Sequence, residues 1–180
     1  MIPPVVTGGP VDSKILFVGQ APGDKEGKLG KPFAWTAGKT LFKWFAPLGF
    51  TEDQFRSRIH MSAVCRCFPG KNPKGGDRVP SPTEVQNCAT WLQEEIRLLR
   101  PTLVIPCGKL AINQFLPVDK LNAVVGKTLK HQMLNLAFDL VALPHPSGAS
   151  TWHRKEPGIS LLHQALRHIG KHPAIRDVLR

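Results

Sequence analysis

Short apolar runs that end at glycine, proline or polar residues recur along the chain, separated by longer stretches with apolar residues at helical spacing. The short runs predict four buried strands, at residues 15–18, 59–64, 103–106 and 140–143. The longer stretches predict helices at residues 36–48, 82–99, 109–115 and 158–169. The second of these helices has a clear start, because Ser81 suits an N-cap, Pro82 the first helical position and Glu84 the third.

Strands that alternate with helices predict parallel βαβ units with helices on both faces of the sheet. We therefore expect an α/β fold, a three-layer α/β/α sandwich around a central, mostly parallel four-stranded sheet. No repeat or linker divides the sequence, so residues 1–180 are expected to form a single domain. In such folds the ligand site lies beyond the carboxyl ends of the strands.

The net charge of the chain indicates what kind of partner it binds. Lys and Arg total 24 against 13 Asp and Glu, a formal net charge of +11, which favours a polyanion such as nucleic acid. A basic enzyme without a nucleic-acid partner, or one drawn to anionic membranes, is the alternative. No apolar run approaches the roughly 20 residues of a membrane span, and the first residues do not resemble a secretion signal. We therefore expect a cytoplasmic, DNA-associated protein.

Three segments that follow predicted strands carry candidate chemistry. The first runs from Gly19 to Glu26 and continues to Gly30-Lys31-Pro32-Phe33, where glycines and prolines form an exposed turn that can approach a ligand closely. The second is His145-Pro146-Ser147-Gly148. The third is residues 62–69, SAVCRCFP, followed by Ser81-Pro82-Thr83-Glu84 and Cys88. The first segment matches neither the Walker A nor the GxGxxG phosphate-binding pattern.

The arrangement G-x-A-P-G-x-x-E-x-x-x-G-x-P-F resembles the first motif of family 4 uracil-DNA glycosylases, with the spacing kept over 15 positions. The His-Pro-Ser segment resembles the last motif of that superfamily, and the third segment is similar to one in families 4 and 5. The resemblance covers about residues 14–170. It implies a monofunctional DNA glycosylase of base-excision repair that hydrolyses the N-glycosidic bond of uracil, or a related deaminated base, flipped out of DNA.

The resemblance also implies residue roles. The backbone amides of Gln20 and Ala21 would bind base carbonyls, Phe33 would stack on the flipped base, and His145 would stabilise negative charge on the departing base. Ala63 occupies the base-reading position. The alternatives are that Phe33 is a core aromatic residue and that His145 is a hydrogen-bonded structural histidine.

Two departures from the family pattern affect the expected activity. Gln20 stands where family 4 has a glutamate that positions or activates water, so Asp24 is expected to supply the carboxylate, ahead of Glu26, which can instead pair with a surface lysine. Ala63 stands where the family has an asparagine that reads the base, which favours a broader range of deaminated bases. The second hypothesis is a weak or inactive relative that binds uracil-containing or abasic DNA. An enzyme acting on RNA or nucleotides is a third.

Residues after His145 are expected to contact DNA. The DNA is predicted to be double-stranded, with single-stranded DNA as the alternative, and the protein is expected to bind it as a monomer. The loop that enters the minor groove would include Ser147, Gly148 and Trp152, with Trp152 as the wedge unless it packs under the loop. The basic residues expected at phosphates are Arg154, Lys155, Lys71, Lys74 and Arg78, although each could equally be a solvated surface charge.

The four cysteines do not fit the family's iron-sulphur cluster. Only Cys67 and Cys88 match cluster positions, and no cysteine precedes Gly19, whereas a cluster normally takes four thiolates. Cys65 is expected to face away from the surroundings of Cys67, and Cys107 to be a small core residue. We therefore expect no metal and no cofactor, with a zinc or partial site as the alternative.

Overall fold

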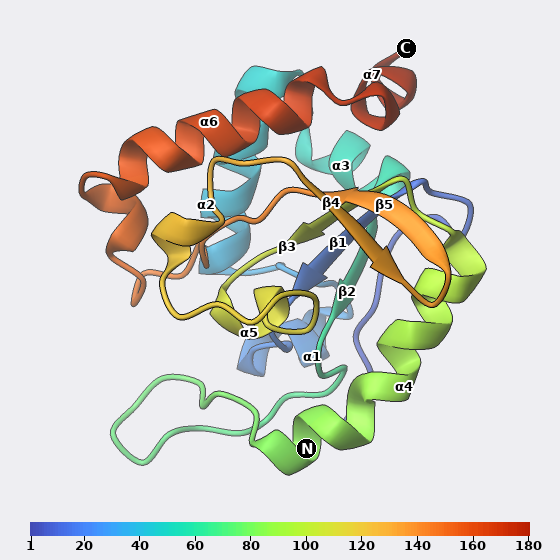
Figure 1. The fold of residues 1–180 in the computed structure, drawn as a ribbon. Coiled ribbons are helices and arrows are strands. Elements are labelled where there is room, and N and C mark those ends of the chain that lie inside the picture. Colours follow the sequence, from blue (N-terminus) through green and yellow to red (C-terminus); the bar gives the residue numbers. More distant parts are fainter.

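A computed structural model describes all residues, 1–180, and contains one five-stranded sheet in the order β2-β1-β3-β5-β4 (Figure 1). The parallel strands are β1 (Ile15–Gly19), β2 (His60–Ala63), β3 (Leu103–Pro106) and β5 (Leu136–Leu140). The edge strand β4 (Leu129–Met133) pairs antiparallel with β5. The predicted fold class is confirmed, but the predicted count of four strands is wrong.

The missed strand belongs to a β4–β5 hairpin. Its turn consists of Leu134 and Asn135, both with positive φ, at 54° and 59°. Two such residues between antiparallel strands form the tight turn that fits the twist of a hairpin. The predicted strand at 140–143 was also placed late, because β5 ends at Leu140. Its continuation still bonds to the chain of β3, with the N–H of Leu143 donating to the carbonyl of Pro106.

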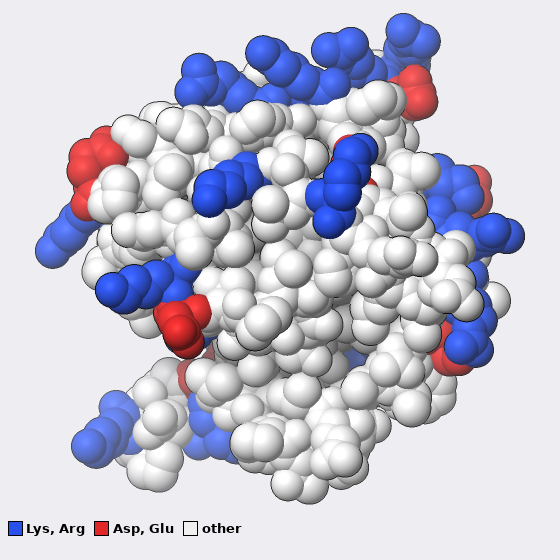
Figure 2. Space-filling model, in the orientation of Figure 1, with Lys and Arg blue, Asp and Glu red and all other residues white.

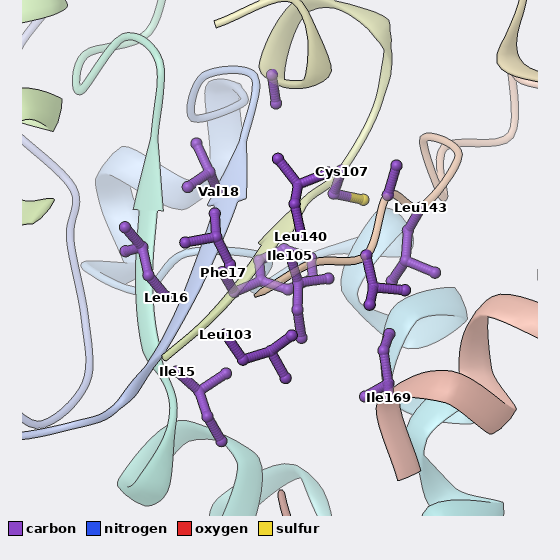
Figure 3. Packing of buried hydrophobic residues seen from close by; sticks show 14 of the residues in the cluster. Ile15, Leu16, Phe17, Val18, Leu103, Ile105, Cys107, Leu140, Leu143 and Ile169 are labelled. Atoms are coloured by element: carbon purple, nitrogen blue, oxygen red, sulfur yellow. The ribbon is translucent and has the colours of Figure 1, made fainter. Parts of the chain in front are cut away.

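Helices cover both faces of the sheet because side chains alternate along each strand. On one face, His60 and Ser62 of β2 meet Glu95 of α4 (Pro82–Leu99). On the other, the Phe17 ring lies 5.8 Å from Phe55 of α3 (Glu52–Arg58). The helices α2 (Thr36–Phe45) and α6 (Gly158–Lys171) complete this layer (Figure 1). Figure 3 shows side chains of β3 and the β5 continuation packed toward Ile169 of α6.

The predicted helix 82–99 is confirmed with its capping box, in which the Ser81 hydroxyl accepts from the N–H of Glu84. The predicted helix 36–48 is α-helical only to Phe45 and then tightens into a 3₁₀ turn, η1 (Ala46–Leu48), that contains Pro47. The predicted helix 109–115 ends too late, because the observed helix ends at Ile112. The predicted helix 158–169 ends too early, because the observed helix continues to Lys171. The remaining short elements are α1 (Asp24–Leu29), α5 (Lys109–Ile112), η2 (Leu121–Ala123), η3 (Trp152–Arg154) and α7 (Pro173–Leu179).

None of the helices has the length and apolar character needed to cross a membrane. The loops that follow β1 and the β5 continuation leave the sheet at its carboxyl edge, together with the long connection between β2 and α4. This edge therefore holds the three segments with candidate chemistry.

Candidate active site

A cleft of about 660 Å³ opens at the carboxyl edge of the sheet, between the loop after β1 and residues 69–80, which we call the insertion loop. The insertion loop projects at the lower left of Figure 1, and Figure 2 shows a notch between it and the rest of the surface. Eight predicted site residues line this cleft: Gln20, Ala21, Asp24, Phe33, Lys71, Arg78, His145 and Ser147. The fold thus brings together segments that lie more than 100 residues apart in the sequence.

Phe33 is held in an uncommon backbone conformation, with φ at 52°. Arg56 donates to the carbonyl oxygens of Pro32 (2.7 Å) and Phe33 (3.1 Å), and these bonds fix the turn. The half-buried ring lies edge-on to Phe17, with 5.4 Å between ring centroids, and leaves surface open to the cleft. A Cβ on Gly19 would lie 2.9 Å from this ring, so only glycine allows the approach. Such local strain is typical of functional sites.

The backbone N–H groups of Gln20 and Ala21 donate no hydrogen bond within the protein. The carbonyl oxygen of Gln20, in contrast, has a partner within the protein. It accepts from the N–H of Cys65 at 3.1 Å, and this bond fixes the loop beside β2. Two free donors are therefore available at the wall of a cleft with a half-buried aromatic ring. Donors in this position can bind carbonyl oxygens of a ligand.

His145 follows the β5 continuation and is half-buried. Its Nδ1 accepts from the N–H of Ser147 at 3.2 Å, so in the neutral ring the proton lies on Nε2. Burial lowers the pKa of His145, and the nearby His153 lowers it further. Gly108, with φ at 90°, makes room for the histidine, since a Cβ there would lie 3.1 Å from its ring. His145 is therefore a neutral hydrogen-bond donor held in one tautomer.

Three carboxylates border the cleft. Glu26 is 9% exposed and accepts from the N–H of Gly23 at 2.7 Å, and burial raises its pKa while backbone hydrogen bonds oppose the rise. The alternative that Glu26 pairs with a surface lysine is therefore wrong, because the carboxylate satisfies backbone groups inside the loop. Asp24 is partly exposed, 3.6 Å from Nζ of Lys71. Sequence reasoning missed Asp77, whose carboxylate lies over Gly23 and pairs with Lys71 at 2.8 Å.

Ala63 does not line the main cleft. It is buried at the end of β2 and borders a recess of about 10 Å³ behind Phe33, together with Gly19 and Ser62. The Ser62 hydroxyl bonds to Glu95, away from this recess. The position predicted to read the base therefore presents only a methyl group.

The predicted DNA-contact residues fall into two groups. Lys71 is ion-paired, and Arg78 forms two bonds to Glu84, at 2.6 and 2.7 Å. The exposed residues without an ion pair are Lys74, Arg154 and Lys155. Gly148 is exposed at the tip of the loop after His145, and a Cβ there would meet nothing.

Trp152 is half-buried and packs against the core, and its indole N–H donates to Asn122 at 2.9 Å. These contacts favour the alternative in which Trp152 packs under the loop. The next residue, His153, was not singled out in the sequence. Its ring is buried 5.1 Å from that of Trp44, and its Nδ1 has no hydrogen-bond partner.

The cysteines gather on one side but do not form a four-thiolate set. The expectation that Cys65 faces away is wrong, because β2 ends at Ala63 and the Cys65 thiol then meets that of Cys88, with Cys67 nearby. Burial and these neighbours raise the pKa of Cys65 to about 12, which disfavours a thiolate ligand. Cys107 is a core residue, as predicted, and bonds to the carbonyl of Pro144.

No three His, Cys, Asp or Glu side chains are arranged to hold a metal ion. These residues do not fit an iron-sulphur cluster, and a protein without a cofactor stays a prediction.

A larger cleft, of about 920 Å³, lies at the opposite end of the sheet beside α7. It contains none of the predicted site residues. Its carboxylate Asp139 is already occupied, since it pairs with both Lys130 (2.6 Å) and His172 (3.3 Å). Size alone therefore does not identify the functional cleft, and the chemistry favours the carboxyl edge.

The fold is an α/β fold with its candidate ligand site at the carboxyl ends of parallel strands. An aromatic ring and a histidine that can donate a hydrogen bond line this site. The family model of the uracil DNA glycosylase superfamily matches residues 6–168, and the chain belongs to this superfamily.

Individual relatives agree with this assignment. A type-4 uracil-DNA glycosylase of Archaeoglobus fulgidus is 30% identical over 140 residues, which are 75% of this chain and 66% of the relative. A type-4 enzyme of Thermotoga maritima is 30% identical over 118 residues, covering 66% and 57%. A type-5 uracil-DNA glycosylase of Pyrobaculum aerophilum is 30% identical over 156 residues, covering 80% and 66%. The chain thus spans about 57 to 66% of the length of these relatives.

Proposed function

We propose that this protein is a monofunctional DNA glycosylase that removes uracil, or a related deaminated base, flipped out of DNA. One observation carries the proposal: free backbone donors at residues 20 and 21, the Phe33 ring and the donor histidine His145 line one cleft. Relatives named uracil-DNA glycosylase support the same reading.

In the proposed reaction the flipped base stacks on Phe33, and its carbonyl oxygens accept from the N–H groups of Gln20 and Ala21. As the N-glycosidic bond breaks, its electron pair moves onto the base, and the Nε2–H of His145 donates to the oxygen where charge builds up. A neutral imidazole performs this role, which agrees with the lowered pKa of His145. Water then adds to the sugar carbon and loses a proton.

We propose Asp24 as the acceptor of that proton. Gln20 can hydrogen-bond to the water but cannot take the proton. Glu26 already binds backbone N–H groups, whereas Asp24 is partly exposed in the cleft. An oxocarbenium-like transition state needs little help from a base, so we expect a modest role. Asp77 lines the same cleft and is the matched comparison. If Asp77→Asn lost more of the rate of base release than Asp24→Asn, Asp77 and not Asp24 would be the proton acceptor.

DNA would lie across the mouth of the cleft. The exposed cations Lys74, Arg154 and Lys155 are free to neutralise phosphates, whereas Lys71 and Arg78 must first leave acidic partners. A row of Lys and Arg also lies along the top of Figure 2, over α6 and α7 and away from this cleft, and contributes to the net charge of +11. Binding should therefore weaken steeply as salt rises.

The test is an abasic-site assay on labelled DNA that carries uracil, hypoxanthine or xanthine, as duplex and as single strand. Release of uracil supports the proposal and shows that an acid at position 20 is dispensable. Release of only the purines would assign the broader specificity that Ala63 allows. Binding without release of any base would favour the second hypothesis, a relative that binds lesions without turnover.

A further inference from the structure

Trp35 is an exposed aromatic side chain at the rim of the cleft. It is 52% exposed and lines the cleft beside Phe33 and Thr36. Tryptophan side chains are mostly buried in folded proteins. Trp44 and Trp152 follow this rule and pack against the core; Trp35 and Trp91 do not, and of these two only Trp35 lines the cleft. An open indole ring thus borders the site at which the base is proposed to bind.

Local stability does not explain a tryptophan at this position. Trp35 is the N-cap residue of α2, and its side chain makes no capping hydrogen bond. Serine, threonine, aspartate and asparagine are the residues that stabilise a helix from this position. Its backbone carbonyl accepts from the N–H of Lys39, a contact that any residue could make. The indole ring therefore has no role in capping the helix.

The surroundings of Trp35 suit the backbone of a nucleic acid. Lys25 lines the same cleft, Lys31 and Lys39 each lie four residues from Trp35 in the sequence, and all three are exposed. Aromatic rings in a positively charged groove are the surface on which single-stranded nucleic acids stack. Phe33 and Trp35 are only two residues apart, so their Cα atoms are at most about 7 Å apart. Both side chains line the same cleft, so the two rings can contact neighbouring nucleotides.

We propose that Trp35 stacks on an unpaired base next to the flipped nucleotide, and that it makes the site favour single-stranded or locally opened DNA. This inference rests on the proposed function for the position of the flipped nucleotide. It adds a residue that positions the DNA strand, together with a strand preference.

The experiment titrates the full chain with a short single-stranded oligonucleotide that lacks damaged bases, and with the matched duplex. Tryptophan fluorescence reports stacking, and the anisotropy of an end label reports affinity. The variants are Trp35→Ala and Trp35→Phe. The control is Trp91→Ala, because Trp91 is 61% exposed but lies on α4 and lines neither large cleft.

DNA should quench the fluorescence of the wild type and of Trp91→Ala, and the quenching should largely disappear in Trp35→Ala. Trp35→Ala should bind the single strand about 10- to 100-fold more weakly, with a smaller loss on the duplex. Trp35→Phe should retain part of the affinity, because it keeps an aromatic face. Equal behaviour of Trp35→Ala and Trp91→Ala would overturn the inference, as would equal losses on duplex and single strand.

Base release measured on the same preparations separates this inference from the proposed function. Trp35-dependent binding without release of any base would refute the glycosylase proposal and leave the stacking role standing. If the protein releases the base, and Trp35→Ala shows unchanged binding and quenching, the glycosylase proposal stands and the stacking role of Trp35 is refuted.

Discussion

The two walls of the cleft are built in different ways. The wall after β1, residues 19–35, is fixed by buried contacts: the Glu26 carboxylate inside the loop, and the Phe33 ring against Gly19. The insertion loop is mostly exposed and is held by backbone hydrogen bonds within the loop, such as that from the N–H of Arg78 to the carbonyl of Gly70, and by ion pairs, with Lys71 between Asp77 and Asp24. It also contains Gly75 and Gly76, whose φ values are positive. The comparison teaches that the wall after β1, where we propose that the base binds, is preorganised, while the insertion loop has fewer buried contacts and can adapt to the proposed DNA ligand.

The largest predicted effect comes from removing the buried carboxylate in the wall after β1. Glu26→Ala leaves the N–H of Gly23 without its acceptor and removes the other backbone contacts of this carboxylate. We expect a loss of about 2–3 kcal/mol in the free energy of unfolding, because buried hydrogen bonds to charged groups are strong. Denaturant unfolding measures this. A loss below that of Asp77→Ala would contradict the contrast between the walls.

The next effect tests the packing of Phe33. Gly19→Ala places a methyl group 2.9 Å from the Phe33 ring, which must then shift. We expect a loss of about 1–3 kcal/mol in stability, together with slower base release, because overpacking displaces the ring that holds the base. The control for stability is Gly148→Ala, where a methyl group meets nothing and the free energy of unfolding should stay unchanged. Unchanged base release in Gly19→Ala would show that the ring position is unimportant.

A pH effect of intermediate size comes from two histidines that follow the β5 continuation, His145 and His153. Burial lowers the pKa of both His145 and His153 in the folded protein. Below about pH 6.5 the unfolded chain therefore binds protons that the folded chain does not, and stability falls as pH falls. Each histidine contributes at most about 1.4 kcal/mol per pH unit.

Thermal unfolding between pH 5.5 and 7.5 measures this dependence. His153→Phe removes one of the two groups, together with a buried Nδ1 that lacks a partner. The variant should lose part of the fall in melting temperature at low pH while remaining folded at pH 7.5. Identical pH dependence in wild type and variant would exclude His153 as a contributor.

The smallest effect is expected in the insertion loop. Lys71→Ala breaks ion pairs in which the lysine side chain is 56% exposed, so the loss of stability should stay below about 1 kcal/mol and shrink in high salt. Denaturant unfolding at two salt concentrations measures this. A loss as large as that of Glu26→Ala would show that the insertion loop is as rigid as the opposite wall.

The sequence predicted the sheet core and the helix 82–99 well, because their signals are local. Apolar runs mark β1 and β3, and Ser81 with Glu84 marks a helix start. It missed β4, whose side chains are only partly buried and whose turn uses Leu134, a residue that seldom adopts positive φ. The weak pattern of an edge strand gave no apolar run to detect.

In the site, sequence motifs identified Gln20, Phe33 and His145, which the cleft unites. The burial of Glu26 and the place of Asp77 over Gly23 depend on how two distant loops meet. The exposure of Trp35 likewise depends on tertiary packing, since aromatic residues usually lie inside. Spacing along the chain cannot show which side chains a fold leaves open.

The most direct test of the account is single-turnover release of uracil by the wild type and by His145→Ala, with DNA affinity measured on the same samples. The account predicts that base release falls about 100- to 1,000-fold in the variant while affinity changes little, because His145 acts on charge that develops during bond cleavage. Equal rates of base release in the two proteins would contradict the site described above.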